Sequence, residues 1–342
     1  MTQHVVEPAT AEQQADSIER YEETLVAGLP SEDAPMAINR AYRRLIPRWH
    51  FAMLNDERRN AAFRAALQAI VRPEHAVLDI GTGTGLLAMM AARAGARAVV
   101  SCEAVTPIAH MARRIVAANG LAGRVDVIAK PSFDLKVGRD MPVRADVLVT
   151  ETIDCGLLGE SVLPIVRHAR RHLLREGARV IPARARVFFR LVESRAIHRN
   201  NFARSAAGLD VSLFNRFSTR EYFPVRLSTW DHRPLCAATP LFDFDFQDGR
   251  LAPRRACIGV EPEQRGWVHG IVFWFELELS PGVHLSNSPD NLDSHWMQAV
   301  HCFERPVPVE RGVSVVVRAA HDDTGFQFSL HPHGVLKAAE ED

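Results

Sequence analysis

Residues 76–103 contain the feature that most constrains the fold of this chain. In chain order it consists of Ala76–Ile80, a glycine turn at 81–85, a helical pattern at 86–94 and Ala98–Cys102. Two short apolar runs joined by a turn and a helix predict a strand–turn–helix–strand unit, the building block of a parallel sheet covered by helices. The second run ends on Glu103, and an acid in this place can accept both hydroxyls of a ribose. The unit therefore indicates nucleoside binding.

The string LDIGTGTG resembles motif I of the Rossmann-like S-adenosylmethionine methyltransferases. Its GxGxG spacing differs from the GxGxxG spacing of phosphate-cradling turns, and NAD binding or a purely structural turn are the alternatives. The resemblance implies that Gly81, Gly83 and Gly85 let the backbone approach the cofactor, since glycine tolerates positive φ. It also implies that Asp79 accepts a hydrogen bond from the amino group of the methionine part and that Glu103 binds the ribose.

Length and charge limit the class of protein. At 342 residues the chain is long enough for two domains, and a hydrophobic content of 47% is enough for buried cores. Basic and acidic residues both total 41, so the formal net charge of zero gives no support for a nucleic-acid partner. Only three of the basic residues are lysines, which suggests a GC-rich bacterial genome because lysine codons are rich in adenine.

Cysteine number and apolar runs indicate the compartment. The five cysteines are odd in number and lack metal-ligand spacing, so we expect free thiols in a reducing cytoplasm and no bound metal. No signal peptide opens the sequence, and no apolar run approaches the roughly 20 residues that a membrane-spanning helix needs. We therefore expect a cytoplasmic protein without a membrane partner.

Composition and periodicity divide the chain into three parts. Residues 1–35 are expected to form a flexible segment, polar to about residue 16 and with a helix over 17–29. The resemblance implies that residues 36–181 form a Rossmann-like S-adenosylmethionine-binding domain with N-terminal lid helices. From residue 182 onward apolar and polar positions alternate between turns, which predicts an antiparallel β-barrel domain over 182–342.

Two helical patterns, at 37–45 and 51–71, lead into the first strand, where a helix commonly lies over the cofactor as a lid. The second pattern contains MLNDERR, residues 53–59, which on sequence physics alone is an exposed, charged helix turn. Beside the glycine turn, the string resembles the MLxDxxR stretch that precedes motif I in protein arginine methyltransferases. The resemblance implies that Met53 packs near the sulfonium and that Arg59 pairs with the carboxylate of the methionine part.

A helix over 107–119 and a strand over 125–129 are predicted next, followed by the string KPSFD. Methyltransferases of this kind bind the adenine amino group with an acid after this strand. The resemblance therefore implies an adenine site that includes Ser132 and Asp134. A plain turn aspartate fits the sequence equally well.

An apolar strand over 145–150 ends on Glu151 and opens the loop ETIDCGLLGE, which closes on Glu160. The loop leaves the carboxyl end of a central parallel strand, where open α/β sheets place their ligands. In an anonymous loop these glutamates would be unrelated surface acids. Here the loop resembles the double-E loop of the protein arginine methyltransferase family.

The tripeptide Ser-His-Trp at 294–296 resembles the THW loop of the same family, so the likeness runs in a consistent order over most of the chain. It is nearest to the monomethylating type III branch. The resemblance implies that Trp296 contributes to substrate binding and that His295 relays the departing proton, with Asp56 as its partner. A lone histidine is more often structural.

The chemistry of a guanidinium acceptor favours a pair of carboxylates over one base. Removing its proton with an ordinary glutamate would be uphill by about 8 pKa units, roughly 11 kcal/mol. Glu151 and Glu160 can instead draw the positive charge toward the nitrogens they touch, so that the remaining nitrogen recovers lone-pair density. Type I enzymes carry a methionine two residues after the first loop glutamate. At the corresponding part of the loop this chain has Ile153 and Asp154. An added acid there would narrow the acceptor pocket and favour monomethylation.

Residues 200–223 interrupt the strand pattern, and family members carry a dimerisation arm there, which implies a homodimer. The sequence thus predicts an S-adenosylmethionine-dependent arginine N-methyltransferase that transfers one methyl group, with free L-arginine favoured as acceptor. A protein arginine methyltransferase is the first alternative. A small-molecule methyltransferase with another acceptor and a non-catalytic cofactor-binding protein are the others.

Overall fold

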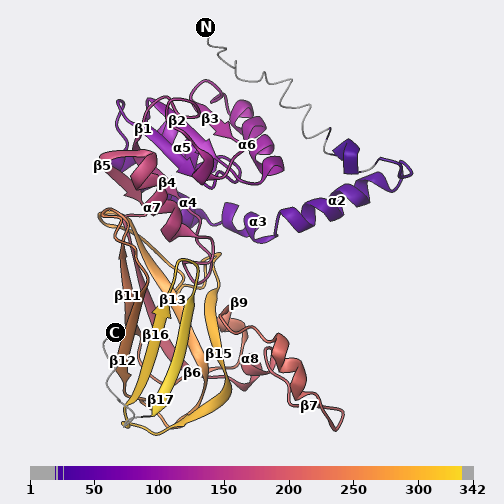
Figure 1. Ribbon diagram of the computed structural model, residues 1–342, viewed down its shortest axis with the longest axis vertical. Helices are drawn as coiled ribbons and strands as arrows, with labels where there is room; N and C mark the ends of the chain where they lie inside the picture. Colours follow the sequence, from indigo (N-terminus) through magenta and orange to yellow (C-terminus); the bar gives the residue numbers. More distant parts are fainter. Residues whose placement is uncertain (1–19, 21, 26, 333–342) are drawn as a thin grey trace. The chain divides into compact units, whose positions relative to one another are not determined.

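The computed structural model describes residue 20, residues 22–25 and residues 27–332 (Figure 1). The chain divides into two compact units. The first comprises the chain up to Glu151 with residues 167–182 and 279–283, and the second comprises residues 152–166, 183–278 and the chain from His284. No helix of the described residues is long and apolar enough to cross a membrane. Residues 1–16, expected to be disordered, lie outside the described part.

The first unit contains a five-stranded parallel sheet with the order β3-β2-β1-β4-β5. Its strands are β1 (Ala76–Ile80), β2 (Ala98–Cys102), β3 (Val125–Ile128), β4 (Ala145–Thr150) and β5 (Leu174–Ile181). All five residues of β1 are buried, as expected for a central strand covered on both faces. The strand order reverses between β1 and β4, and the carboxyl ends of these strands are where open α/β sheets bind ligands.

The helices of this part are α2 (Ala34–Leu45), α3 (Trp49–Leu54), α4 (Glu57–Ile70), α5 (Leu86–Arg93), α6 (Thr106–Ala118), the short η1 (Ser132–Asp134) and α7 (Val162–His172), which contributes residues to both units. Of the helix expected over 17–29, residue 20 and residues 22–25 are helical, whereas residues 27–29 form a turn, so the helix does not extend to residue 29. The continuous helix expected over 51–71 is wrong, because α3 ends at Leu54 and α4 starts anew after Asp56. Sequence periodicity did not reveal that an aspartate would cap a second helix here.

The second unit is antiparallel, which confirms the antiparallel part of the predicted fold class. Its strands include β6 (Arg184–Glu193), β9 (Phe223–Val225), β10 (Arg233–Pro234), β11 (Thr239–Asp245), β12 (Arg254–Val260), β13 (Gly266–Ser280), β14 (Val283–Ser286), β15 (Gln298–Val309), β16 (Val315–His321) and β17 (Phe326–Pro332). One sheet is built around β6, β13 and β15, and another has the order β12-β16-β17. No ladder of hydrogen bonds closes these sheets into a barrel among the described residues, although β11 packs beside β12 and β15 beside β17.

Residues 200–223 form the segment expected to be an arm. It contains β7 (Ser205–Ala206), β8 (Leu209–Asp210) and η2 (Ser212–Phe217). The helix α8 (Arg195–Arg199) precedes it, and η3 (Leu227–Thr229) follows β9. The start of the segment is anchored, because Phe202 is buried in a cluster with residues of β6, β13 and β15. Its middle is exposed and apolar, with Leu213 83% and Phe217 81% exposed.

Candidate cofactor and acceptor sites

The glycine turn after β1 depends on left-handed backbone. Gly81, Gly83 and Gly85 have φ angles of 84°, 52° and 80°, which L side chains rarely adopt. A Cβ at Gly85 would also lie 3.1 Å from Val116, so the glycine lets α5 approach α6. The Gly81 amide donates to the Cys102 carbonyl at 3.0 Å. The turn is thereby fixed against the end of β2.

Glu103, directly after β2, is held by two backbone amides. Its Oε2 accepts from Gly83 N at 3.1 Å, and its Oε1 accepts from Val105 N at 2.9 Å. A carboxylate offers about four lone-pair sites, so each oxygen retains acceptor capacity. The arrangement suits the predicted ribose contact, which stays a prediction.

Asp79 is a fully buried carboxylate in β1. Its Oδ2 accepts from Ser101 Oγ at 2.6 Å, and Ser101 Oγ lies 2.5 Å from Thr82 Oγ1. Its Oδ1 is buried and has no hydrogen-bond partner among the described residues. Burial raises the pKa of Asp79 to about 7, and the Ser101 hydrogen bond opposes the rise. Sequence reasoning missed Ser101, although a polar residue inside an apolar strand was a visible signal.

Asp56 and Arg59 begin α4, and neither is exposed. Asp56 Oδ1 accepts from Arg59 N at 2.8 Å, the hydrogen bond of a helix N-cap. The Arg59 guanidinium donates to Glu151 Oε2 at 2.8 Å and to Asn60 Oδ1 at 2.9 Å. The interpretation of this string as an exposed charged turn therefore holds only in part, because Glu57 and Arg58 are exposed while Asp56 and Arg59 are buried. The predicted role of Asp56 as partner of His295 is untested.

Glu151 is buried at the end of β4, where its side chain is 7% exposed. Burial raises the pKa of Glu151, and the charge and hydrogen bond of Arg59 oppose that rise. A buried ion needs such a hydrogen-bonded counterion, because desolvation alone would be costly. Glu151 and Arg59 thus form a buried ion pair at the edge of the sheet where β1 also ends.

Two buried atoms of this cluster, one acceptor and one donor, lack a hydrogen-bond partner among the described residues. Asp79 Oδ1 requires a donor and Arg59 Nε requires an acceptor, since neither has a partner within the described residues. An amino-acid group with its ammonium and its carboxylate supplies one of each. The residues therefore fit the methionine part of S-adenosylmethionine.

The other residues predicted to contact the cofactor differ in exposure. Met53 in α3 is 8% exposed, and Ser132 at the start of η1 is buried. Asp134 at the end of η1 is exposed. Their contacts with sulfonium and adenine stay predictions.

The loop from Thr152 to Glu160 belongs to the second unit and is held by side chains that follow it far along the chain. Trp296 Nε1 donates to the Ile153 carbonyl at 3.0 Å, and Asn287 Nδ2 donates to the Cys155 carbonyl at 3.0 Å. Asn287 Nδ2 also donates to the Met297 carbonyl at 2.8 Å, which links this loop to the segment that carries His295. Asn287 was missed from sequence because no local pattern marks an asparagine that bridges distant segments.

Asp154 uses both carboxylate oxygens inside the second unit. Oδ1 accepts from Gly159 N at 2.9 Å, and Oδ2 accepts from the Tyr222 hydroxyl at 2.9 Å. Burial raises the pKa of Asp154, and these hydrogen bonds oppose the rise. Its predicted place beside the acceptor is untested.

Glu160 lies between two strained parts of the loop. Leu157 and Ser161 have φ angles of 83° and 66°, and left-handed non-glycine residues cost about 1–3 kcal/mol each. Such strain persists only where surrounding contacts determine the conformation, and it is concentrated at functional sites. The loop that carries Glu160 is therefore built for a specific geometry.

His295 and Trp296 lie side by side with ring centroids 4.1 Å apart. The backbone around them is fixed by Arg226, which donates to the Ser294 carbonyl at 2.8 Å and to the His295 carbonyl at 3.1 Å. Trp296 is 6% exposed and packs edge-on against Phe275 at 5.3 Å. The structure thus places Trp296 as an anchor of the loop, while its predicted substrate contact is untested.

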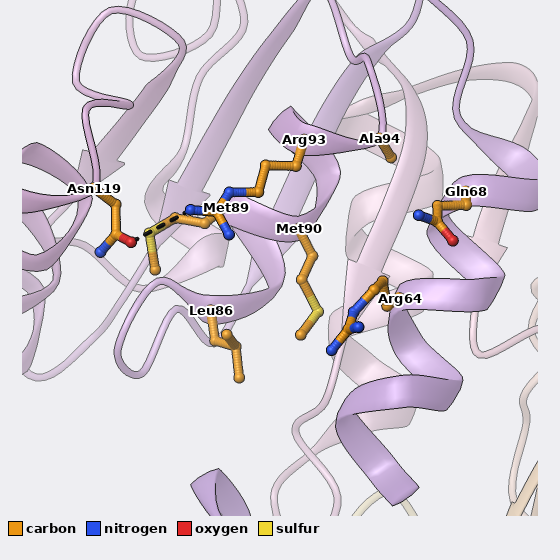
Figure 2. A pocket seen from close by; sticks show the side chains of 8 residues that line it. All are labelled: Arg64, Gln68, Leu86, Met89, Met90, Arg93, Ala94 and Asn119. Carbon is orange, nitrogen blue, oxygen red and sulfur yellow. Dashed lines mark hydrogen bonds between the residues drawn. The ribbon is translucent and has the colours of Figure 1, made fainter. Parts of the chain in front are cut away.

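A separate cavity of about 430 Å³ lies between α4, α5 and the residue after α6 (Figure 2). Met89 and Met90 line it together with Arg64 of α4 and Arg93 of α5, and the Arg93 guanidinium donates to Asn119 Oδ1 at 3.5 Å. It contains none of the residues predicted to bind the cofactor or the acceptor, so the cavity and the predicted sites do not coincide.

The described residues give no sign of a metal centre, because no three His, Cys, Asp or Glu side chains among them gather as ligands. All five cysteines are free thiols, as expected.

Two family profiles divide the chain near residue 182. Residues 64–181 match the family described as ribosomal protein L11 methyltransferase. Residues 183–328 match the family described as arginine methyltransferase oligomerization subdomain.

Curated relatives match most of the chain. Arginine N(omega)-methyltransferase of Streptomyces achromogenes subsp. streptozoticus is 46% identical over 288 residues, which are 84% of this chain and 80% of the relative. Protein arginine N-methyltransferase 7 of Drosophila grimshawi is 35% identical over 324 residues, which are 82% of this chain and 46% of the relative. The chain spans about half the length of the fly relatives.

Solved structures share the fold. The Trypanosoma brucei PRMT1 enzyme–prozyme heterotetrameric complex with AdoHcy matches with a TM-score of 0.71 and 26% identity, over 85% of this chain and 95% of that chain. Arabidopsis thaliana protein arginine methyltransferase 10 matches with a TM-score of 0.64 and 21% identity, over 82% of this chain and 95% of that chain. The second likeness concerns the fold alone.

Proposed function

Because the chain belongs to the protein arginine methyltransferase family, we propose that it transfers one methyl group to a terminal guanidino nitrogen of free L-arginine. The chain is an S-adenosylmethionine-dependent arginine N-methyltransferase. The observation that carries transfer to a guanidino nitrogen is the buried Glu151 side chain directly after β4, paired with Arg59 in the same cluster as Asp79.

The cofactor, when bound, supplies an already activated methyl group, so the protein must supply position and electrostatics. Asp79 and Arg59 would hold the two charged groups of its methionine part, and Glu103 would accept from its ribose. Because these side chains are fixed by Ser101, Glu151 and backbone amides, they need little rearrangement on binding.

Glu151 and Glu160 act on the acceptor as a pair of carboxylates. The guanidinium keeps its proton at neutral pH, because its pKa lies near ~12.5 to 13.8. Carboxylates on two of its nitrogens hold the positive charge there, which leaves lone-pair density on the third. His295, with Asp56 as its partner, then accepts the proton that becomes acidic after transfer. Asp154 narrows the acceptor pocket and favours a single methylation.

Free arginine is favoured because it presents charges that a peptide lacks. Its α-carboxylate and α-amine need partners in a closed site, where an unpaired charge is costly. Arg40, Arg43 and Arg44 in α2 and Arg48 before α3 are exposed and can supply the cation. The name of the Streptomyces relative, arginine N(omega)-methyltransferase, supports the same acceptor and a terminal nitrogen.

The assembly follows from the exposed apolar middle of residues 200–223. We propose that this segment docks on a second copy in a two-fold homodimer, because exposed apolar patches of this kind mark interaction surfaces. The arginine bias of the sequence and the free cysteines support a bacterial cytoplasmic protein.

A competition between two acceptors tests the proposed substrate. The purified protein would receive S-adenosylmethionine and equal amounts of L-arginine and an arginine–glycine peptide with blocked ends. Mass spectrometry should find methylated L-arginine as the main product. Efficient methylation of the peptide with none of the amino acid would reverse the choice in favour of a protein substrate.

A further inference from the structure

Tyr222 joins the acceptor loop to the end of the segment 200–223. It lies directly before β9, and its hydroxyl donates to Asp154 Oδ2 at 2.9 Å. Its ring packs edge-on against Phe273 of β13, with centroids 5.2 Å apart at 82°. The ring is thus fixed by the sheet while the hydroxyl reaches the loop.

The loop sequence is fitted to this ring. A Cβ at Gly156 would lie 2.6 Å from ring carbons of Tyr222, so a larger residue cannot stand there unless the ring moves. A Cβ at Gly159 would lie 2.5 Å from Asp154 Oδ2 and 3.0 Å from the Tyr222 hydroxyl. Neither Gly156 nor Gly159 has a positive φ, so backbone conformation does not require glycine there. The close contacts with Tyr222 and Asp154 are what exclude a side chain at both positions.

The pair supports the half of the loop that carries Glu160. Trp296 and Asn287 hold the carbonyls of Ile153 and Cys155, which both precede the glycines. The second half contains the strained Leu157 and Ser161, and its Gly159 N donates a hydrogen bond to Asp154 Oδ1. Asp154 is in turn held by Tyr222.

We infer that Tyr222 is a positioning residue that, through Asp154, sets the place of the Glu160 carboxylate and couples it to the segment 200–223. The role of Glu160 in gripping the acceptor rests on the proposed function. Asp154 transmits this restraint to the loop, because its two oxygens accept from Gly159 N and from the Tyr222 hydroxyl.

The test compares Tyr222→Phe, which removes only the hydroxyl, with Ser329→Ala, which removes a hydroxyl paired with His331 in β17. Tyr222→Phe should lower kcat/KM for arginine by about tenfold or more, as expected for losing a hydrogen bond to a charged group. The dissociation constant of S-adenosylmethionine and the melting temperature should match those of Ser329→Ala. Wild-type turnover in Tyr222→Phe, or an equal loss of cofactor affinity, would overturn the inference.

A double-mutant cycle separates the pair from two independent effects. Asp154→Asn should lower kcat/KM as well, and adding Tyr222→Phe to it should cause little further loss, because the two groups act through one hydrogen bond. Losses that multiply in the double variant would show that Tyr222 and Asp154 act independently and would contradict the inference.

Hydrogen exchange gives a readout that does not depend on activity. Tyr222→Phe should speed amide exchange over residues 156–161, and Ser329→Ala should not. Unchanged exchange there would overturn the inference. If exchange rises while the wild-type protein methylates no guanidine, the positioning role is supported and the proposed function is what fails.

Discussion

The cofactor cluster and the acceptor loop are stabilised in different ways. Glu103 is fixed by amides at most 20 residues away, and Asp79 by Ser101 on the neighbouring strand. The loop that ends in Glu160 is fixed by Tyr222, Asn287 and Trp296, which follow it by 68 to 143 residues. Glu103 and Asp79 are therefore positioned within one local motif, whereas the acceptor loop depends on the second unit being folded.

Glu160→Gln gives the largest expected effect and separates the two regions. The substitution removes charge and keeps shape, so turnover should fall by at least about 100-fold, the low end for losing one preorganised electrostatic contact. Cofactor affinity should be unchanged, because the groups that fit the cofactor lie in the other unit. Steady-state kinetics and calorimetry measure the two quantities. A variant with wild-type turnover would show that charge localisation by this residue is wrong.

Deleting residues 203–220 tests whether the acceptor region needs a second copy. The deletion removes the apolar side chains of Leu209, Leu213, Phe214 and Phe217, so the protein should become monomeric and lose most of its turnover. Replacing these four residues with serine is the matched control and should give the same monomer. Light scattering that finds an unaltered dimer in both variants would refute the dimerisation role.

Glu103→Ala should weaken cofactor binding and leave the acceptor loop unchanged. Losing a charged acceptor for the ribose hydroxyls should cost about 2 kcal/mol of binding, roughly 30-fold in dissociation constant. Glu103→Gln keeps one acceptor oxygen and should cost less, and Glu74→Ala removes an exposed acid before β1 and should cost nothing. Unchanged affinity in a folded Glu103→Ala protein would remove this residue from the cofactor site.

Protonation of Asp79 should give the smallest effect. Its pKa of about 7 lies above the ordinary value, so the cofactor-free protein keeps this proton up to near neutral pH. The contribution of this proton to the free energy of unfolding is fully present below the ordinary pKa of an aspartate and is lost as the pH rises toward 7. An ammonium group favours the ionised form, so cofactor binding should release a proton and strengthen several-fold between about pH 5 and 7. Calorimetry in buffers with different ionisation enthalpies measures this release. Asp79→Asn should abolish it, and a wild-type enthalpy independent of buffer would contradict the assigned protonation.

The comparison also explains how much the sequence could predict. Strand β1, the glycine turn, β2 and Glu103 follow one another within 28 residues, so periodicity and glycine chemistry locate them directly. The buried pairing of Arg59 with Glu151 joins residues 92 positions apart, and no spacing rule could have revealed it. The break at Asp56 was also missed, because a capping aspartate and a surface aspartate look alike in sequence. Tyr222 and Asn287 carried no signal, since their partners in the loop lie 68 and 132 positions away in the sequence.

Product analysis tests the central claim most directly. Wild-type protein, S-adenosylmethionine and a panel of guanidines that includes L-arginine would be incubated, and the products identified by mass spectrometry. The account predicts L-arginine with one added methyl group as the main product, and its loss in Glu160→Gln. A folded wild-type protein that binds the cofactor and methylates no guanidine in the panel would contradict the account.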